Sequence, residues 1–167
     1  MEQKPTYEEL KQRIKELEKE AAERKQLEKE LRESRHYYSS LFNQLHEDIL
    51  IVDRNYRITD VNKAFLLTIG HAREKVIGRH CYEISHGSNK PCKKHGEECP
   101  LHKVFTTGKP HTSCHQHTHV KGWKVWVYTL MSPLKDEKGK VTHIIEVIRN
   151  MDNFIKVVGR SLQNSVK

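Results

Sequence analysis

The strongest constraint on this chain is a run over residues 7–45 that contains neither glycine nor proline. An apolar stripe recurs within it at alternating steps of three and four residues, with a three-residue offset near its middle. Its members are Tyr7, Leu10, Ile14, Leu17 and Ala21, followed by Leu27, Leu31, Ser34, Tyr38, Leu41 and Leu45. Such heptad spacing predicts a long helix that buries a narrow stripe against a second helix. We expect residues 1–45 to form a coiled coil with an identical chain; the alternative is a solitary helix held by charge pairs.

The net charge of +8 is unevenly distributed along the chain. Residues 1–35 contain ten lysines and arginines and ten acidic residues, so residues 36–167 carry the whole excess. The basic side chains in that part are scattered, and only Lys90, Lys93 and Lys94 lie close together. This pattern favours an ordinary solvated surface over a nucleic-acid-binding patch, so we expect no nucleic-acid partner.

The pattern changes after residue 46 to strands, short helices and turns. Residues 49–52 and 56–61, with the turn Asp53-Arg54-Asn55 between them, are typical of the two strands of a hairpin. Asn62 is placed to cap a short helix that Gly70 ends, and a second brief helix over residues 73–77 is closed by Gly78. A third helix is expected from Pro100 to Thr107, followed by Gly108.

Three more strands are expected near residues 110–120, 123–131 and 141–148. The middle strand has apolar side chains on both faces, with Val127 and Met131 on one face and Trp126 on the other. We expect the second face to meet the amino-terminal helix or a second chain. The predicted fold is therefore α+β, with residues 46–152 as the domain and residues 153–167 as an amphipathic helix after it.

No window of the sequence is long and apolar enough to cross a bilayer, and the first residues lack the apolar run of a secretion signal. We expect a cytoplasmic protein without a membrane segment. Disulfides are disfavoured in that compartment, so cysteines grouped in such a chain more often serve metal or redox chemistry.

The cysteines and histidines of this chain are concentrated in one region. All four cysteines lie between positions 81 and 114, and nine of the twelve histidines lie between positions 71 and 119. Thiolates and imidazoles together suit zinc or iron, and four cysteines can hold an iron-sulfur cluster. The predicted metal ligands are Cys81, His86, Cys92 and Cys99, with Cys114 and His117 as substitutes. The alternative is that the cysteines are small buried hydrophobic residues and the histidines lie on the surface.

Cys99 has a special place in this region because it precedes Pro100 at a predicted helix start. The helix dipole and the nearby Lys93 and Lys94 favour its thiolate, which suits a ligand or a redox centre. An enzyme with Cys99 as nucleophile and His102 as base would also need a third group to orient the base, and the sequence offers none that can be identified. We expect no catalytic activity. The Cys-x-x-Cys-His motif of c-type haem is absent, but a b-type haem with one histidine ligand stays open.

Several motifs in order resemble those of a PAS domain. They are the opening Leu41-Phe42-Asn43-Gln44-Leu45-His46-Glu47-Asp48-Ile49-Leu50-Ile51-Val52-Asp53, then Ile58-Thr59-Asp60-Val61-Asn62-Lys63-Ala64-Phe65, Ile77-Gly78-Arg79, Thr107-Gly108-Lys109-Pro110, Ser132-Pro133-Leu134-Lys135-Asp136-Glu137-Lys138-Gly139 and Glu146-Val147-Ile148-Arg149-Asn150. The resemblance implies a five-stranded antiparallel sheet with short flanking helices, in a sensory module of bacterial signalling proteins that is usually dimeric. Its ligand in this family can be haem, flavin, a metal, an organic acid or nothing.

The segment from Cys81 to Gly87, with Pro91-Cys92 and Cys99-Pro100-Leu101, resembles a cysteine-bearing PAS subgroup. The start of the chain resembles that of cytoplasmic bacterial sensor kinases, which implies a histidine kinase or regulator as downstream partner. We therefore expect a cytoplasmic PAS module that dimerises through its coiled coil and sheet face. It would sense through a metal or iron-sulfur centre and relay the signal to the flanking helices. The alternatives are a module that binds haem or an organic ligand, and a cofactor-free interaction module.

Overall fold

A computed structural model describes residues 5–92, 99–119 and 121–151. The chain divides into two units, residues 1–42 and residues 43–167, and each is described here by itself. The amphipathic helix expected over residues 153–167 lies outside the described residues.

The first unit contains most of helix α1, which spans Tyr7–Gln44 and confirms the long helix predicted from the heptad run. Its start is closed by a reciprocal pair: the Thr6 amide donates to Glu9 Oε2 at 2.7 Å, and the Glu9 amide donates to Thr6 Oγ1 at 3.3 Å. No residue of α1 is buried within the single chain, and the leucines of the apolar stripe are among its exposed side chains. The helix is therefore confirmed, and its pairing into a coiled coil stays a prediction.

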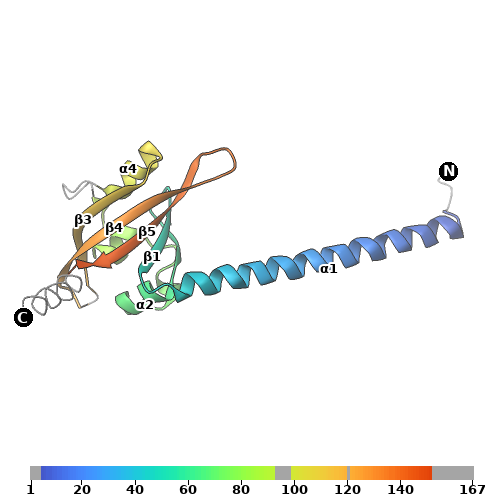
Figure 1. The fold of residues 1–167 in the computed structure, drawn as a ribbon, viewed down its shortest axis with the longest axis horizontal. Helices are drawn as coiled ribbons and strands as arrows, with labels where there is room; N and C mark the ends of the chain where they lie inside the picture. The colour runs from blue at the N-terminus through green and yellow to red at the C-terminus, as the bar shows by residue number, and fades with distance from the viewer. Residues whose placement is uncertain (1–4, 93–98, 120, 152–167) are drawn as a thin grey trace, which may run out of the picture. The chain divides into compact units, whose positions relative to one another are not determined.

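The second unit contains a five-stranded antiparallel sheet in the order β2-β1-β5-β4-β3 (Figure 1). The strands are β1 (Asp48–Asp53), β2 (Ile58–Val61), β3 (His111–Thr118), β4 (Lys124–Lys135) and β5 (Val141–Asn150). The hairpin and the three later strands predicted from the sequence are all present. The α+β fold with a five-stranded sheet is thus confirmed.

Between β2 and β3, the described residues form the short helical segments α2 (Lys63–Ile69), the 3₁₀ turn η1 (Arg73–Lys75), α3 (Cys81–Ser85) and α4 (Pro100–Thr107). As predicted, Asn62 caps α2, and Gly70 and Gly108 end α2 and α4 in the left-handed conformation. Helix α4 lies along β3, β4 and β5 (Figure 1). Helix α3 was not expected from the sequence.

The core lies between one face of the sheet and these short helices. Its buried residues are Leu50, Val52, Ile58, Val61, Phe65, Val76, Cys81, Leu101, Val104, Val127, Met131, Ile144 and Ile148. The opposite face of β4 carries Trp126 and Leu130, which are 52% and 41% exposed. Coverage of that face by a partner, as expected from the sequence, stays a prediction.

Candidate metal centre and neighbouring thiol pair

Three histidines gather at one end of the sheet. His86, His115 and His117 each offer a ring nitrogen, and these three atoms lie within 4.8 Å of one another. Within residues 5–92, 99–119 and 121–151, this is the one group of three or more metal-ligating side chains that approach so closely. The ring centroids are 4.8 Å apart for His115 and His117 and 4.9 Å apart for His86 and His117.

The alternation of strand β3 brings two of these rings to the same face. Side chains two apart along a strand share a face, so His115 and His117 point together toward the helices, while Cys114 and Gln116, on either side of His115, point to the other side. The burial of β3 follows this pattern, since His117 is buried and Cys114 is exposed. Cys114 therefore lies on the opposite face of the strand from the two histidines.

His86 reaches β3 because the end of α3 is tied to that strand. It follows Ser85, the last residue of α3, and Gly87 then turns the chain with φ of +62°. Thr118 Oγ1 donates to the His86 carbonyl at 2.8 Å, and His86 Nδ1 lies 3.2 Å from the Gln116 carbonyl. Since a carbonyl only accepts, Nδ1 carries the ring proton and Nε2 is left as the atom that can bind a metal.

The surroundings of His117 favour its neutral ring. His115 Nε2 and His117 Nε2 are 2.9 Å apart, so one of them donates a proton and the other accepts it. Burial holds the pKa of His117 well below its usual value, and the nearby His86, His115 and Lys124 lower it further. A neutral imidazole is the form that binds metal ions. At neutral pH, His117 is therefore in the form that binds a metal ion.

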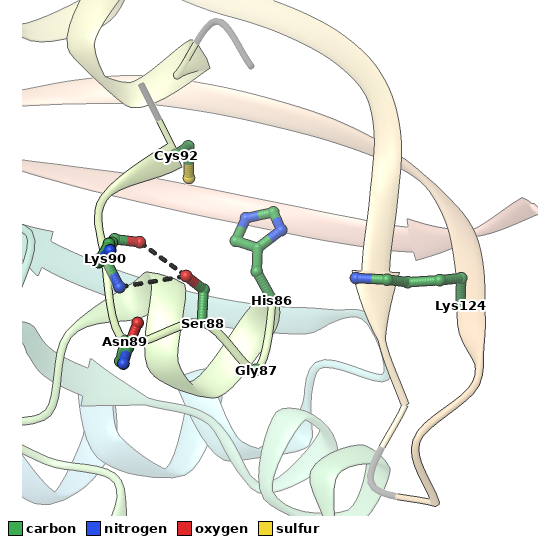
Figure 2. Close-up of a pocket in the computed structure, with 7 residues that line it drawn as sticks. All are labelled: His86, Gly87, Ser88, Asn89, Lys90, Cys92 and Lys124. Atoms are coloured by element: carbon green, nitrogen blue, oxygen red, sulfur yellow. Dashed lines mark hydrogen bonds between the residues drawn. The ribbon is translucent and has the colours of Figure 1, made fainter. Parts of the chain in front are cut away.

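A pocket of about 580 Å³ opens beside His86 (Figure 2). Its lining residues are His86, Gly87, Ser88, Asn89, Lys90, Cys92 and Lys124. The loop that forms one side is held by Ser88, whose hydroxyl donates to the Lys90 carbonyl and accepts from the Lys90 amide. Lys124 projects from β4 at the other side and donates to Thr118 Oγ1 at 2.8 Å. The pocket is polar and basic, and His86 and Cys92 share it.

Two cysteines form a second cluster. Cys99 precedes α4 as its N-cap residue, and hydrogen bonding between its side chain and that of Cys92 is the leading cause of the pKa shift of each cysteine. This contact lowers the pKa of Cys99 to about 7, and the backbone amides of His102 and Leu101 lower it as well. The same contact raises the pKa of Cys92, with burial as the second cause. The pair therefore favours ionisation of Cys99 over that of Cys92.

Cys81 and Glu146 lie deeper in the core near this pair. Burial raises the pKa of Cys81 well above its usual value, and the charges of Glu146 and Cys99 raise it further. Glu146, on the inward face of β5, is 4% exposed. Burial and the Cys99 thiolate raise the pKa of Glu146 to about 8. His102, considered beside Cys99 as a catalytic partner, has its Nδ1 3.2 Å from the Tyr56 hydroxyl.

The six ligands predicted from the sequence thus fall into three groups. His86 and His117 come together, Cys92 and Cys99 contact each other with Cys81 nearby, and Cys114 lies on the opposite face of β3. The third histidine of the cluster, His115, was missing from that prediction. The spacing of two between His115 and His117 in a predicted strand is the signal that would have identified it.

The sequence matches the PAS fold family over residues 42–154. These residues make up more than half of the chain, and the chain belongs to this family. Proteins of this fold are generally sensory or interaction modules. The resemblance seen in the sequence motifs is thereby confirmed, whereas the cysteine-bearing subgroup stays a prediction.

Solved structures share the fold at low sequence identity. A PAS domain from Colwellia psychrerythraea is 17% identical with a TM-score of 0.58, and the match covers 69% of this chain and 94% of that one. The PAS domain of BvgS from Bordetella pertussis is 21% identical with a TM-score of 0.57, over 82% and 98% of the two chains. A light-oxygen-voltage domain studied with a flavin analogue is 20% identical with a TM-score of 0.52, over 71% and 88%. At these identities the likeness shows the fold alone.

No curated protein matches the chain. In the part of the chain that the structure describes, no helix is both long enough and apolar enough to span a membrane.

Proposed function

We propose that this chain is a PAS sensory module whose input is a transition-metal ion bound by His86, His115 and His117. The observation that carries the proposal is the convergence of three ring nitrogens within 4.8 Å of one another. Three imidazoles with an open fourth position are a ligand set of zinc sites, and imidazole also suits copper, nickel and iron. The cysteine ligands predicted from the sequence stay a prediction.

The surroundings of the cluster support a metal site. The Gln116 carbonyl fixes the His86 ring so that Nε2 is the ligand atom, as hydrogen bonds to the second ring nitrogen do in metal sites. The pocket beside His86 gives an ion and a small fourth ligand a way in. Lys124 at its edge repels a cation but favours an anionic fourth ligand, which offsets the charge of the ion.

Metal binding would join two parts of the fold. His86 ends α3, whereas His115 and His117 belong to β3, which pairs with β4 along its whole length. An ion held by all three rings would cross-link the α3 end to the sheet, and β4 would carry the change to β5. We propose that this change reaches the helices that flank the domain, in a cytoplasmic signalling protein with a histidine kinase or regulator as its partner.

Replacing His117 with alanine is expected to lower the affinity for Zn²⁺ at least tenfold, because it removes one of three ligands. The affinity of the full chain is measured by competition with a chromogenic chelator. His111 lies on the same face of β3 at its far end, so His111→Ala is the matched control and should leave the affinity unchanged.

His117 is buried, so circular dichroism must show that the variant is folded. His86→Ala, at a less buried position, repeats the test without a buried cavity. Equal affinities for the unmodified chain, His117→Ala and His86→Ala would refute the proposed site. Binding of haem or flavin without any zinc binding would favour the alternative of an organic cofactor.

We also propose that the chain dimerises through the apolar stripe of α1, with a second copy of the chain as the partner helix. Leu31→Glu, on the stripe, should shift the mass in sedimentation equilibrium from twice the 19.7 kDa chain toward the single chain. Gln26→Glu adds the same charge off the stripe and should leave the dimer intact. A monomeric unmodified chain at micromolar concentration would contradict the coiled coil.

A further inference from the structure

The pocket beside His86 has a composition that favours a negatively charged ligand. Its volume of about 580 Å³ lies within the range of about 300–1,000 Å³ that is typical of small-molecule sites. Of the described residues that line it, none is acidic and two are basic, Lys90 and Lys124. Ser88 and Asn89 add polar side chains to the lining. The pocket therefore combines room for a small molecule with positive local charge.

Lys124 is held at the edge of this pocket, next to the histidine cluster. Figure 2 shows its side chain extending from β4 toward His86. Its Nζ donates to Thr118 Oγ1 at 2.8 Å, and the same hydroxyl donates to the His86 carbonyl at 2.8 Å. An ammonium group has three N–H donors, so it can keep this bond and also donate to a bound anion. The position of Lys124 is thus tied to that of a proposed metal ligand.

A metal ion in the cluster would add to this positive charge. Histidine binds a metal ion as a neutral imidazole, so His86, His115 and His117 leave the charge of a divalent ion uncompensated. Three ligands also leave the fourth position of a tetrahedral ion open. An oxyanion has at least two oxygen atoms, of which one can bind the ion there and another can accept from the Lys124 ammonium group. A bound oxyanion would therefore satisfy the ion and the lysine together.

We propose that the pocket binds a small oxyanion that bridges the metal ion and Lys124, so that the chain responds to the ion and the anion together. This inference rests on the three-histidine site proposed above. The ion joins the end of α3 to β3, and the anion extends that link to Lys124 at the start of β4. A carboxylate and a phosphate share the required chemistry. Because the two ligands contact each other, each raises the affinity of the chain for the other by the same factor.

Co²⁺ makes the fourth ligand visible, because its absorption bands change with the atoms that bind it. The full chain is loaded with one equivalent of Co²⁺ at pH 7 and titrated with sodium acetate and, separately, with inorganic phosphate. Sodium perchlorate at equal ionic strength is the control for charge screening. A saturable change with acetate identifies a carboxylate as the ligand, a change with phosphate identifies a phosphate, and either supports the proposal. At saturation with that anion, the affinity for Co²⁺ should rise about fivefold.

Variants of Lys124 test the bridge. Lys124→Met keeps a long side chain without the ammonium group, so it should weaken binding of the anion about fivefold. It should not weaken binding of Co²⁺ in perchlorate, because it removes a positive charge near the ion. Lys124→Arg keeps the charge and should restore most of the anion affinity. Lys121→Met is the matched control and should bind the anion normally, since Lys121 lies over the Trp123 ring, outside the described lining of the pocket.

The outcomes separate this inference from the metal site itself. Co²⁺ that binds to the chain but shows the same absorption in acetate, phosphate and perchlorate would overturn the oxyanion and leave the metal site standing. Equal anion affinities for Lys124→Met and the unmodified chain would overturn the bridge to Lys124. A chain that binds no Co²⁺ in any of the three salts would refute the metal site, and the oxyanion site with it.

Discussion

Asn62→Ala should lower the free energy of unfolding of the PAS domain by about 4 kcal/mol, because it leaves the amides of two buried residues and two further carbonyl groups without their side-chain partner. Asn62 is fully buried, and its Oδ1 accepts from the amides of Ile49 and Phe65, each at 3.0 Å. Its Nδ2 donates to the carbonyls of Glu47 at 2.8 Å and Leu45 at 3.3 Å. One side chain thus joins the start of β1 to the first turn of α2.

Urea denaturation followed by tryptophan fluorescence measures this effect, since both tryptophans belong to the sheet domain. Asn55→Ala, at an exposed turn position, is the matched control and should cost less than about 1 kcal/mol. Asn62→Asp keeps the two acceptor bonds but turns a carboxylate toward two carbonyls, so it should also destabilise the domain. An Asn62→Ala variant as stable as the Asn55→Ala control would show that the capping network has no energetic role.

We expect the unmodified domain to lose stability as the pH rises to neutral and alkaline values. Glu146→Gln should prevent that loss. The folded-state pKa of Glu146 is about 8, whereas the ordinary pKa of a glutamate is 4.5, so between these values the folded domain holds a proton that the unfolded chain has released. Stability from this group is complete below pH 4.5 and falls as the pH rises toward 8. The sign follows from the folded protein binding more protons than the unfolded one.

The measurement is the difference in unfolding free energy between Glu146→Gln and the unmodified chain at several pH values. The difference should move in favour of the variant by roughly 3 kcal/mol between pH 5 and pH 8. Glu137→Gln, at an exposed turn, should show no such trend. A difference that is constant across this range would mean that Glu146 titrates at its usual pKa.

The fold could be predicted in large part because local signals agree with it. The heptad run alone predicts α1, and Asn62 and Gly70 predict the two ends of α2 without knowledge of any tertiary contact. Strand β4 runs four residues beyond the expected end because Pro133 pairs there with β5 alone. The part of β4 that pairs with β3 ends at Met131. The missing amide of Pro133 therefore breaks no hydrogen bond between β4 and β3.

The site was harder to predict because its members are brought together by the fold. Helix α3 has five residues, too few for a periodic signal, yet it buries Cys81 at its start and presents His86 at its end. Sequence grouping placed Cys114 with the histidines, but strand alternation separates them. The contact of Cys92 with Cys99 depends on where α4 packs, which no spacing in the sequence reveals.

X-ray absorption at the zinc edge, on the full chain loaded with one equivalent of Zn²⁺, tests the central claim most directly. Binding by His86, His115 and His117 predicts a nitrogen or oxygen shell at about 2.0–2.1 Å with the scattering pattern of imidazole rings. A sulfur shell at about 2.3 Å would place the ion on the cysteines, and a chain that retains no zinc would remove the metal site altogether. Either result would contradict the three-histidine site.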